Sequence, residues 1–413
     1  MWAKTGILAA FALVLTYVET FLPLPIPVPG AKLGLANIPV LMALKILNTK
    51  SALVIALIKV LVTGLLFGSP IMIPYSLAGT LFALLVMRLL SFIPGLHVII
   101  ISIAGSVFHI VGQLAVASLM LGTLLVWYTL PLLLVVACAT GVLTGNITIY
   151  LLSHLDTKGQ PDATALISPK TKSSKASRDF SRDLLGSTEK KPLYPLLEKA
   201  DTRILIIALA LYIIVVFCVQ SDIVLYICVI VAVVMAVIAK IRVRDALKAL
   251  VPLASILIVT AVAQILYVQE GQVVAALGPF VVTQEALVVV GRMLLRLICV
   301  MIASIAFMNI TTTDKLIVAL DSMLRPLKKL GVKTEVFILT LNLTLQFLPI
   351  LLAEFKQLKA EAEAEDPHFG KGGLLTKARS YQKLLPPLAT NSFRYAEEVA
   401  DSYTNGSYRL KVS

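Results

Sequence analysis

Long apolar runs separated by short polar breaks make up most of the chain. Residues 1–155 and 203–310 are almost continuously apolar, whereas residues 156–192 are rich in Ser, Thr, Pro and Lys. Beyond Pro349 the chain turns polar but remains helical in pattern. A membrane-spanning helix requires about 20 apolar residues. The pattern therefore predicts two membrane modules joined by a polar linker and followed by a charged helical tail.

The first module, residues 1–155, divides into six predicted helices, near 5–22, 33–47, 51–68, 74–90, 97–120 and 124–152. Alternating prolines between Pro23 and Gly30 predict a stiff, extended loop, because proline lacks a backbone donor and fixes φ. Most basic residues fall on the opposite side from this loop, at Lys4, Lys50, Arg88 and Lys158. The positive-inside rule then puts both ends of the module in the cytoplasm and the loop outside.

The linker, residues 156–192, has too few large apolar residues to form a core, so it is predicted to be disordered. The second module, residues 193–413, has four predicted spans, near 203–220, 222–240, 247–268 and 285–308. Residues 269–284, with one acidic and no basic residue, are predicted to be a loop on the outer side. Residues 314–330 carry an apolar stripe at helical spacing. Residues 334–360 form a long helix that becomes charged, and residues 374–402 form another polar helix, with a break at Pro386 and Pro387.

The composition supports an all-α integral membrane protein. The chain is 58% hydrophobic and 14% charged, with a mean hydropathy of +0.93, against about 45–50% apolar and about 25% charged residues in soluble domains. The net charge of +13 would suggest nucleic acid in a soluble protein. Here Lys and Arg flank the apolar runs, as in cytoplasmic membrane loops. The predicted surroundings are therefore the lipid bilayer, and no nucleic acid is expected.

Sequence motifs of catalysis are absent. The chain has no Walker A segment, no Asp-Asp-x-x-Asp pair to hold magnesium on a diphosphate, and neither HExxH nor GxSxG. Its four cysteines and four histidines lack metal-ligand spacing. We therefore expect a protein that is not an enzyme, with no catalytic residue, cofactor or metal.

Polar residues inside predicted spans are costly and mark functional positions. In the first module they include Glu19, Lys45, Lys59, His109 and Gln113. His109 and Gln113 share a helix face, so they either line a substrate cavity or hold the bundle together. Lys32 and Asn37 lie beneath the predicted outer loop, where a positive charge suits an anionic or carbonyl-rich ligand.

Gly6 and Ala10 form a small-xxx-small pair in the first predicted helix. Such pairs allow two helices to approach closely. This pair is the predicted contact between the two modules.

Two family resemblances rest on specific stretches. Residues from about 5 to 152 resemble the family labelled heptaprenyl diphosphate synthase component I, also called the Gx transporter family. The matching stretches are Tyr17–Glu19, Pro23–Asn37, Gly64–Gly68, Tyr75–Gly79 and His109–Gln113. That family is similar to the substrate-binding S components of energy-coupling factor (ECF) transporters. The resemblance implies a substrate site at Glu19, Lys32, Asn37, Tyr75, His109 and Gln113.

Residues from about 193 to 409 resemble the transmembrane T component of the same transporters. The supporting segments are Arg296–Thr313, Leu324–Gly331 and Leu345–Pro349. The resemblance implies that residues 314–330 and 355–409 are coupling helices that dock on ABC-type ATPase subunits, with Arg325 in the first of them.

The resemblance has one clear departure. The T-component family has two Ala-Arg-Gly motifs whose arginines engage the ATPases. Here the first motif reads Ala364-Glu365-Asp366, and the second falls at Asn405-Gly406-Ser407. Neither retains the arginine, and the first reverses its charge. Either the ATPase partner has a changed surface, or coupling to ATP has been lost.

The favoured hypothesis is an S–T fusion subunit of an ECF-type transporter in the cytoplasmic membrane of a prokaryote, moving a small vitamin- or cofactor-like solute. The family's associations suggest a flavin or a quinone precursor. One alternative is an ATP-independent scaffold or adaptor for an extracytoplasmic redox or flavin system. Another is a non-catalytic partner of a prenyl diphosphate synthase.

Overall fold

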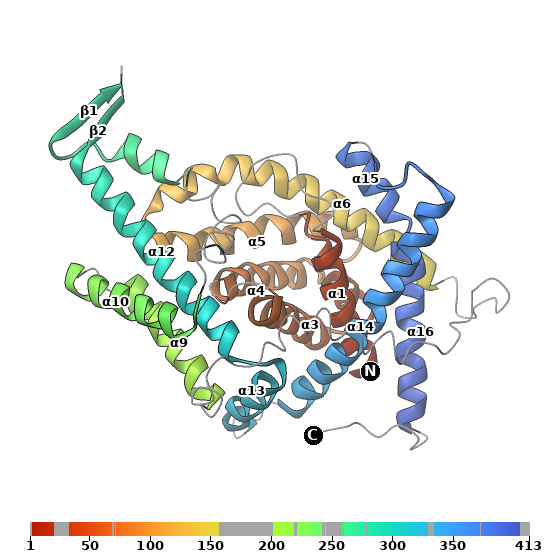
Figure 1. Cartoon of the computed structure of the whole chain (residues 1–413). Coiled ribbons are helices and arrows are strands. Elements are labelled where there is room, and N and C mark those ends of the chain that lie inside the picture. The colour runs from red at the N-terminus through yellow and green to blue at the C-terminus, as the bar shows by residue number, and fades with distance from the viewer. Residues whose placement is uncertain are drawn as a thin grey trace.

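The computed structural model is a bundle of helices in which the two ends of the chain pack together (Figure 1). It describes residues 2–19, 33–67, 70, 72–156, 201–218, 221–241, 244, 258, 260–277, 280–328, 334–371 and 373–404. The proline-rich segment 23–30, Lys32, the linker from residue 157 onward and residues 405–407 lie outside this part. We use N-terminal module for residues 2–156 and C-terminal module for residues 201–404.

The N-terminal module contains the predicted helices, with three of them divided. Its elements are α1 (Trp2–Glu19), η1 (Leu35–Asn37), α2 (Ile38–Ile46), α3 (Thr49–Val62), η2 (Thr63–Phe67), α4 (Met72–Leu90), α5 (Val98–Leu121), η3 (Leu124–Thr129) and α6 (Leu130–Asp156). The short 3-10 helices η1 and η3 lead into α2 and α6, and η2 is a π-helical turn that ends the third predicted helix.

Glycines bring α4, α5 and α6 together. A Cβ at Gly112 of α5 would lie 2.8 Å from the Ala78 carbonyl oxygen of α4, and one at Gly141 of α6 would lie 2.6 Å from Ile103 Cα of α5. Real Cβ atoms do not approach backbone this closely, so these positions require glycine. Small residues at helix contacts are typical of membrane bundles.

The C-terminal module is also mainly helical. Its described elements include α9 (Thr202–Cys218), α10 (Asp222–Ile238), β1 (Val273–Leu277), β2 (Phe280–Thr283), α12 (Gln284–Ile310), α13 (Thr313–Lys328), α14 (Thr334–Glu365), α15 (Leu374–Gln382) and α16 (Leu385–Thr404). Of the predicted span 247–268, the structure describes residue 258 and residues 260–268, and residues 260–267 are helical.

Two expectations for this module need correction. The segment 269–284 was expected to be a loop, but β1 and β2 pair as an antiparallel hairpin; its β-branched Val pairs favour strands. Pro386 and Pro387 were expected to break a helix, whereas the break falls earlier and both prolines lie in the first turn of α16. Proline fits there because first-turn N–H groups have no partner within the helix.

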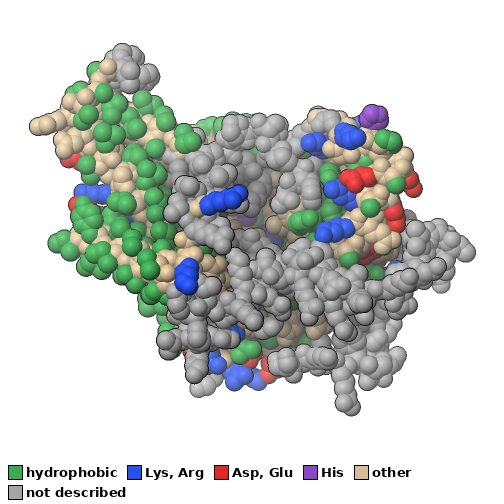
Figure 2. Space-filling view, viewed as in Figure 1, with side chains coloured by type: hydrophobic (Ala, Val, Ile, Leu, Met, Phe, Trp, Pro, Cys, Tyr) green, Lys and Arg blue, Asp and Glu red, His purple; other side chains and the backbone are tan. Residues whose placement is uncertain are grey.

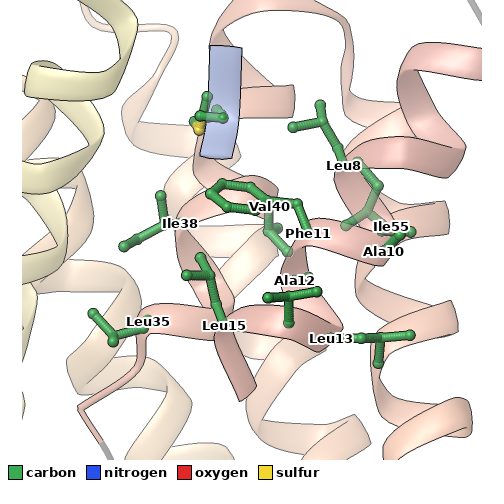
Figure 3. Packing of buried hydrophobic residues seen from close by; sticks show 14 of the residues in the cluster. Leu8, Ala10, Phe11, Ala12, Leu13, Leu15, Leu35, Ile38, Val40 and Ile55 are labelled. Atoms are coloured by element: carbon green, nitrogen blue, oxygen red, sulfur yellow. The ribbon is translucent and has the colours of Figure 1, made fainter. Parts of the chain in front are cut away.

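Helix α1 lies at the centre of the main hydrophobic core. The side chains of Phe11 and Leu15 of α1 lie near Ile38 and Val40 of α2 (Figure 3). The same core includes Leu351 and Phe355 of α14 and Leu388 of α16, all without exposed surface. The two ends of the chain therefore share one core, and α1 is an internal helix of the whole molecule.

Apolar and charged side chains occupy different parts of the surface. Green apolar atoms cover α9, α10 and α12, whereas charged side chains gather over α15 and the adjoining end of α14 (Figure 2). Ile223, Val237 and Ile204 are each at least 66% exposed. Six described helices are long and apolar enough to cross a membrane: α1, α4, α5, α6 with η3, α12 and α14. These features confirm an all-α membrane protein.

Candidate functional site

A partly enclosed pocket lies inside the N-terminal module, between η1, α2, α4, α5 and α6. Its polar wall consists of Asn37, Thr80, Ser102, Ser106 and Thr144. Its apolar wall consists of Ile38, Val40, Leu41, Ala83, Met87 and Gly105. Gly105 leaves room for the Met87 side chain beside the pocket, because a Cβ there would lie 2.7 Å from Met87 Cγ and Sδ. The cavity is small, about 20 Å³, which is room for about one water molecule.

A buried lysine lies behind the polar wall. Lys59 of α3 is 8% exposed, and its Nζ donates a hydrogen bond of 2.6 Å to Oδ1 of Asn37. Placing an ammonium group inside an apolar bundle is costly, so such residues serve a function more often than a packing role. The bond also fixes the Asn37 amide, since its oxygen is turned toward Lys59.

Thr80 has a buried hydroxyl with no hydrogen-bond partner in the described structure. The residue is 4% exposed and lies within α4. Other buried helical threonines donate to a carbonyl one turn earlier, as Thr144 does to Thr140 and Thr148 does to Thr144. Buried polar atoms normally have a partner, and an unpaired one calls for an explanation. Since Thr80 lines the pocket, a single water molecule bound there would supply that partner.

Ser102 and Thr144 complete the polar wall. Their hydroxyl oxygens are 2.8 Å apart. Because Thr144 already donates its proton to the Thr140 carbonyl, Ser102 is the donor in this pair. Ser102 therefore offers only lone pairs to the pocket, whereas Thr80 can donate.

Of the predicted substrate residues that the structure describes, Asn37 lines the pocket. His109 and Gln113 instead pack at the α4–α5 contact, where a Cβ at Gly79 would lie 2.7 Å from the His109 carbonyl oxygen and from Gln113 Cγ. Tyr75 packs against a satellite cluster around Leu114. Glu19 is half-buried at the end of α1, and Lys32 lies outside the described residues.

The sequence analysis did not identify the pocket hydroxyls. Thr80, Ser102, Ser106 and Thr144 come from three helices and have no common spacing. Small polar residues in apolar helices more often serve packing, so the sequence alone does not single them out. Lys59 was noted as a lysine inside a predicted span but was not assigned to a site. Its position in an apolar span is the one feature of the sequence that marks it.

The contact between the modules is a second functional feature. Gly6 of α1 faces α14, where its added Cβ would lie 2.9 Å from Leu343 Cβ. The Thr344 hydroxyl is 3.2 Å from the Gly6 carbonyl oxygen, to which it donates. Ala10, its predicted companion, is fully buried in the same core. The helices therefore approach closely because Gly6 has no side chain.

Helix α1 follows α14 over a long stretch. Gly6 meets Thr344 near one end, and Tyr17 meets Phe355 near the other with ring centroids 6.4 Å apart. The two helices therefore run in the same direction. Phe355 also stacks on Tyr381 of α15 at 6.4 Å. The end of α1 thus packs against the charged tail helices.

Further contacts join the modules elsewhere. Lys4 of α1 pairs with Glu397 of α16 at 2.9 Å. Tyr128 of η3 and Tyr267 share a hydrogen bond of 2.6 Å, with ring centroids 5.4 Å apart. A Cβ at Gly122 would lie 3.8 Å from a guanidinium nitrogen of Arg296. The N-terminal module therefore contacts α12, the helical residues 260–267 and the tail helix α16.

The predicted coupling residues that the structure describes lie on the surface. Arg325 of α13 is exposed and pairs with Asp321 at 3.0 Å. Ala364 and Glu365 end α14, and Asp366 follows; all three are exposed. Asn405, Gly406 and Ser407 lie outside the described residues.

Comparison with known proteins matches each half of the chain to a different group. The family described as "Heptaprenyl diphosphate synthase component I" matches residues 8–151. The energy-coupling factor transporter transmembrane protein EcfT of Thermosediminibacter oceani is 28% identical over 174 residues, which are 42% of this chain and 65% of that protein. The EcfT of Acidaminococcus fermentans is 28% identical over 214 residues, 52% of this chain and 79% of that protein.

The chain thus covers just under two thirds of the length of the Thermosediminibacter relative. Both relatives are named as transmembrane parts of energy-coupling factor transporters, in agreement with the resemblance of the C-terminal module to a T component. The family described as "Cobalt transport protein" matches residues 196–410, more than half of the chain. The protein therefore belongs to the cobalt transport protein family.

Proposed function

We propose that this protein is an S–T fusion subunit of an ECF-type transporter in a prokaryotic cytoplasmic membrane. The N-terminal module would bind a small vitamin- or cofactor-like solute, and the C-terminal module would be the scaffold. The observation that carries the proposal is the packing of α1 along α14, from Gly6 to Tyr17. A binding module coupled to a scaffold needs such a continuous contact.

The direction of α1 supports movement of the N-terminal module. The predicted topology puts the end of α1 on the outer side, whereas the charged tail belongs to the cytoplasm. Yet Tyr17 packs against Phe355, next to the charged end of α14. The outer position expected for the end of α1 and the cytoplasmic position expected for the tail are both compatible with this contact if the N-terminal module has rotated in the membrane toward the tail helices, a movement called toppling. Toppling would carry a solute bound to the N-terminal module from one side of the membrane toward the other.

The partners would be ABC-type ATPase subunits bound to α13 and the exposed end of α14. Glu365 stands where the family has an arginine, so the partner surface would be complementary to a carboxylate. Charge complementarity of this kind gives specificity more than affinity. A dedicated ATPase pair is therefore expected.

The missing arginines also support a second candidate, an ATP-independent adaptor for an extracytoplasmic redox or flavin system. In that case the docked arrangement of the modules would be a permanent scaffold, and α13 to α15 would bind no ATPase.

Affinity purification of the full chain from its own host tests the proposal. ABC-type ATPases should be recovered with the protein, and Glu365→Arg should reduce their recovery by about tenfold, since reversing a contact charge costs at least ~1.4 kcal/mol. Glu270→Arg, an equal charge reversal at an exposed site before the hairpin, is the control and should leave recovery unchanged. Purification without any ATPase would contradict the proposal and support the adaptor.

A further inference from the structure

We propose that Glu354 is a proton-binding site, where the carboxyl group is protonated at neutral pH and pairs with the Asn391 amide across the contact between α14 and α16. Release of this proton would weaken the attachment of α16 to α14. The inference concerns the tail of the chain and does not depend on the proposed transport function.

The Glu354 carboxyl lies between two helices at the end of the main core. Glu354 follows Leu351 of α14 by three residues, and Asn391 follows Leu388 of α16 by three residues. Both leucines are fully buried in the same core. Since residues three apart are neighbours on a helix surface, the pair lies about one turn beyond this core on both helices. Nδ2 of Asn391 donates a hydrogen bond to Oε1 of Glu354.

Two acceptor oxygens of this pair have no donor. Oε2 of Glu354 and Oδ1 of Asn391 are both buried and lack a hydrogen-bond partner in the described structure. A buried acceptor without a partner is costly, and a charged one is more costly still. An ionised carboxylate is an acceptor only and has no proton to offer. The ionised form of Glu354 therefore leaves both oxygens unmatched.

One proton on Oε2 would remove both mismatches. It turns this oxygen into a hydroxyl donor. The acceptor would be Oδ1 of Asn391, in the same amide that already donates to Oε1. Carboxyl and carboxamide groups are both planar and similar in size, so the two hydrogen bonds can form side by side. The protonated acid and the amide would then satisfy each other's buried oxygens.

The charged side chain that acts on Glu354 is Arg394 of α16. Its guanidinium favours the ionised carboxylate, but it gives Oε2 no hydrogen bond. From the other helices packed here, Tyr17 of α1 and Tyr381 of α15 contact the neighbouring Phe355 instead. The two unmatched oxygens therefore need a proton in spite of the nearby positive charge.

Ionisation of Glu354 would change how the tail is held. The carboxylate would face the Asn391 carbonyl oxygen without a proton between them, and two acceptors repel each other. Helix α16 also carries Glu397, which pairs with Lys4 of α1 at 2.9 Å. Loss of the proton would therefore loosen α16 and, through it, one contact with the N-terminal module.

Infrared spectroscopy of the full chain in detergent tests the protonation state directly. A protonated carboxyl has a C=O stretch that an ionised carboxylate lacks. At neutral pH, the difference spectrum between the unchanged chain and Glu354→Gln should contain this acid band. Glu363→Gln, on the same helix with 52% of the native side chain exposed, is the matched control. Its difference spectrum should contain no acid band.

Thermal unfolding tests the effect on the tail. An exposed glutamate titrates at about pH 4.3. Between that pH and the pH at which Glu354 titrates, the folded chain binds one proton more than the unfolded chain, so its stability falls as pH rises. In Glu354→Gln the amide keeps both bonds at every pH. Relative to this variant, the apparent melting temperature of the unchanged chain should fall by about 2–4 °C between about pH 5 and about pH 8. Glu363→Gln should follow the unchanged chain.

Three results would overturn the inference. They are an unchanged acid band in Glu354→Gln, melting temperatures of Glu354→Gln and the unchanged chain that move in parallel with pH, and a Glu354→Gln chain that does not elute from a sizing column as a single species. The last result counts against it because glutamine reproduces both bonds of the protonated acid. None of them bears on the recovery of ABC-type ATPases, so failure of the proton site and failure of the proposed function are separate outcomes.

Discussion

At Gly6 the absence of a side chain allows α1 to reach α14. A Cβ there would lie 2.9 Å from Leu343 Cβ and 3.5 Å from the Thr340 carbonyl oxygen. A larger residue has to move Leu343 or separate the helices. This single position therefore controls the contact between the modules.

Gly6→Leu should destabilise the full chain by about 1–3 kcal/mol, the usual cost of overpacking. The measurement is the apparent melting temperature in detergent. Gly291→Leu is a matched control, since a Cβ at Gly291 in α12 meets no described heavy atom within 4 Å. Equal melting temperatures for both variants would contradict the tight contact at Gly6.

Single residues also mark the limit of sequence prediction. Gly6 and Asn37 were identified from a spacing and from a polar residue near the predicted outer loop, and the structure places them at α14 and in the pocket. Thr80 could not be identified, because its significance is a missing hydrogen bond, which only the fold reveals. His109 and Gln113 stood out as polar, yet they pack beside Gly79 outside the pocket wall.

Among the elements, α14 differs most from what the sequence predicted. Residues 334–360 were not counted among the predicted spans, yet α14 is long and apolar enough to cross a membrane. However, Leu351 and Phe355 are covered by protein, and α1 lies along it. Hydropathy indicates that a helix is buried away from water, but it does not show whether lipid or another helix covers it. Apart from the divided stretch 374–402, the predicted helices that the structure describes in full begin and end within a few residues of the prediction, since apolar length and breakers set their ends.

The hairpin at the start of α12 shows a second limit. Its strands are five and four residues long, and such short segments carry too little periodicity to separate strand from loop. The register, Val273 with Thr283, depends on pairing across the hairpin. That pairing is not visible in either segment alone.

Phe355→Ala should destabilise the chain by about 3–5 kcal/mol, as expected for a fully buried phenylalanine. Its ring contacts Tyr17 of α1 and Tyr381 of α15, so loss of the ring loosens three helices together. Phe92→Ala, whose ring is 63% exposed, is the control and should change the melting temperature little. A similar, small effect of both variants would contradict the shared core.

For the whole molecule, the central claim is that the N-terminal module docks on the tail helices of its own chain. One core includes α1, α14 and α16, and Tyr128 with Tyr267 forms a further contact between the modules. The sequence predicted the two modules and a contact at Gly6. It could not predict whether that contact forms within one chain, because local patterns do not specify which copy a helix meets.

Carbodiimide cross-linking of Lys4 to Glu397 tests this claim most directly. Their side chains are 2.9 Å apart and reach solvent, so a zero-length amide link should form. The full chain is prepared as an equal mixture of normal and heavy-nitrogen protein, mixed before membrane extraction, and linked peptides are identified by mass spectrometry. Lys359 with Glu363, 3.7 Å apart on α14, serves as the positive control. We predict Lys4–Glu397 links whose two peptides carry the same label. Links of mixed label, or none while the control link forms, would contradict docking within one chain.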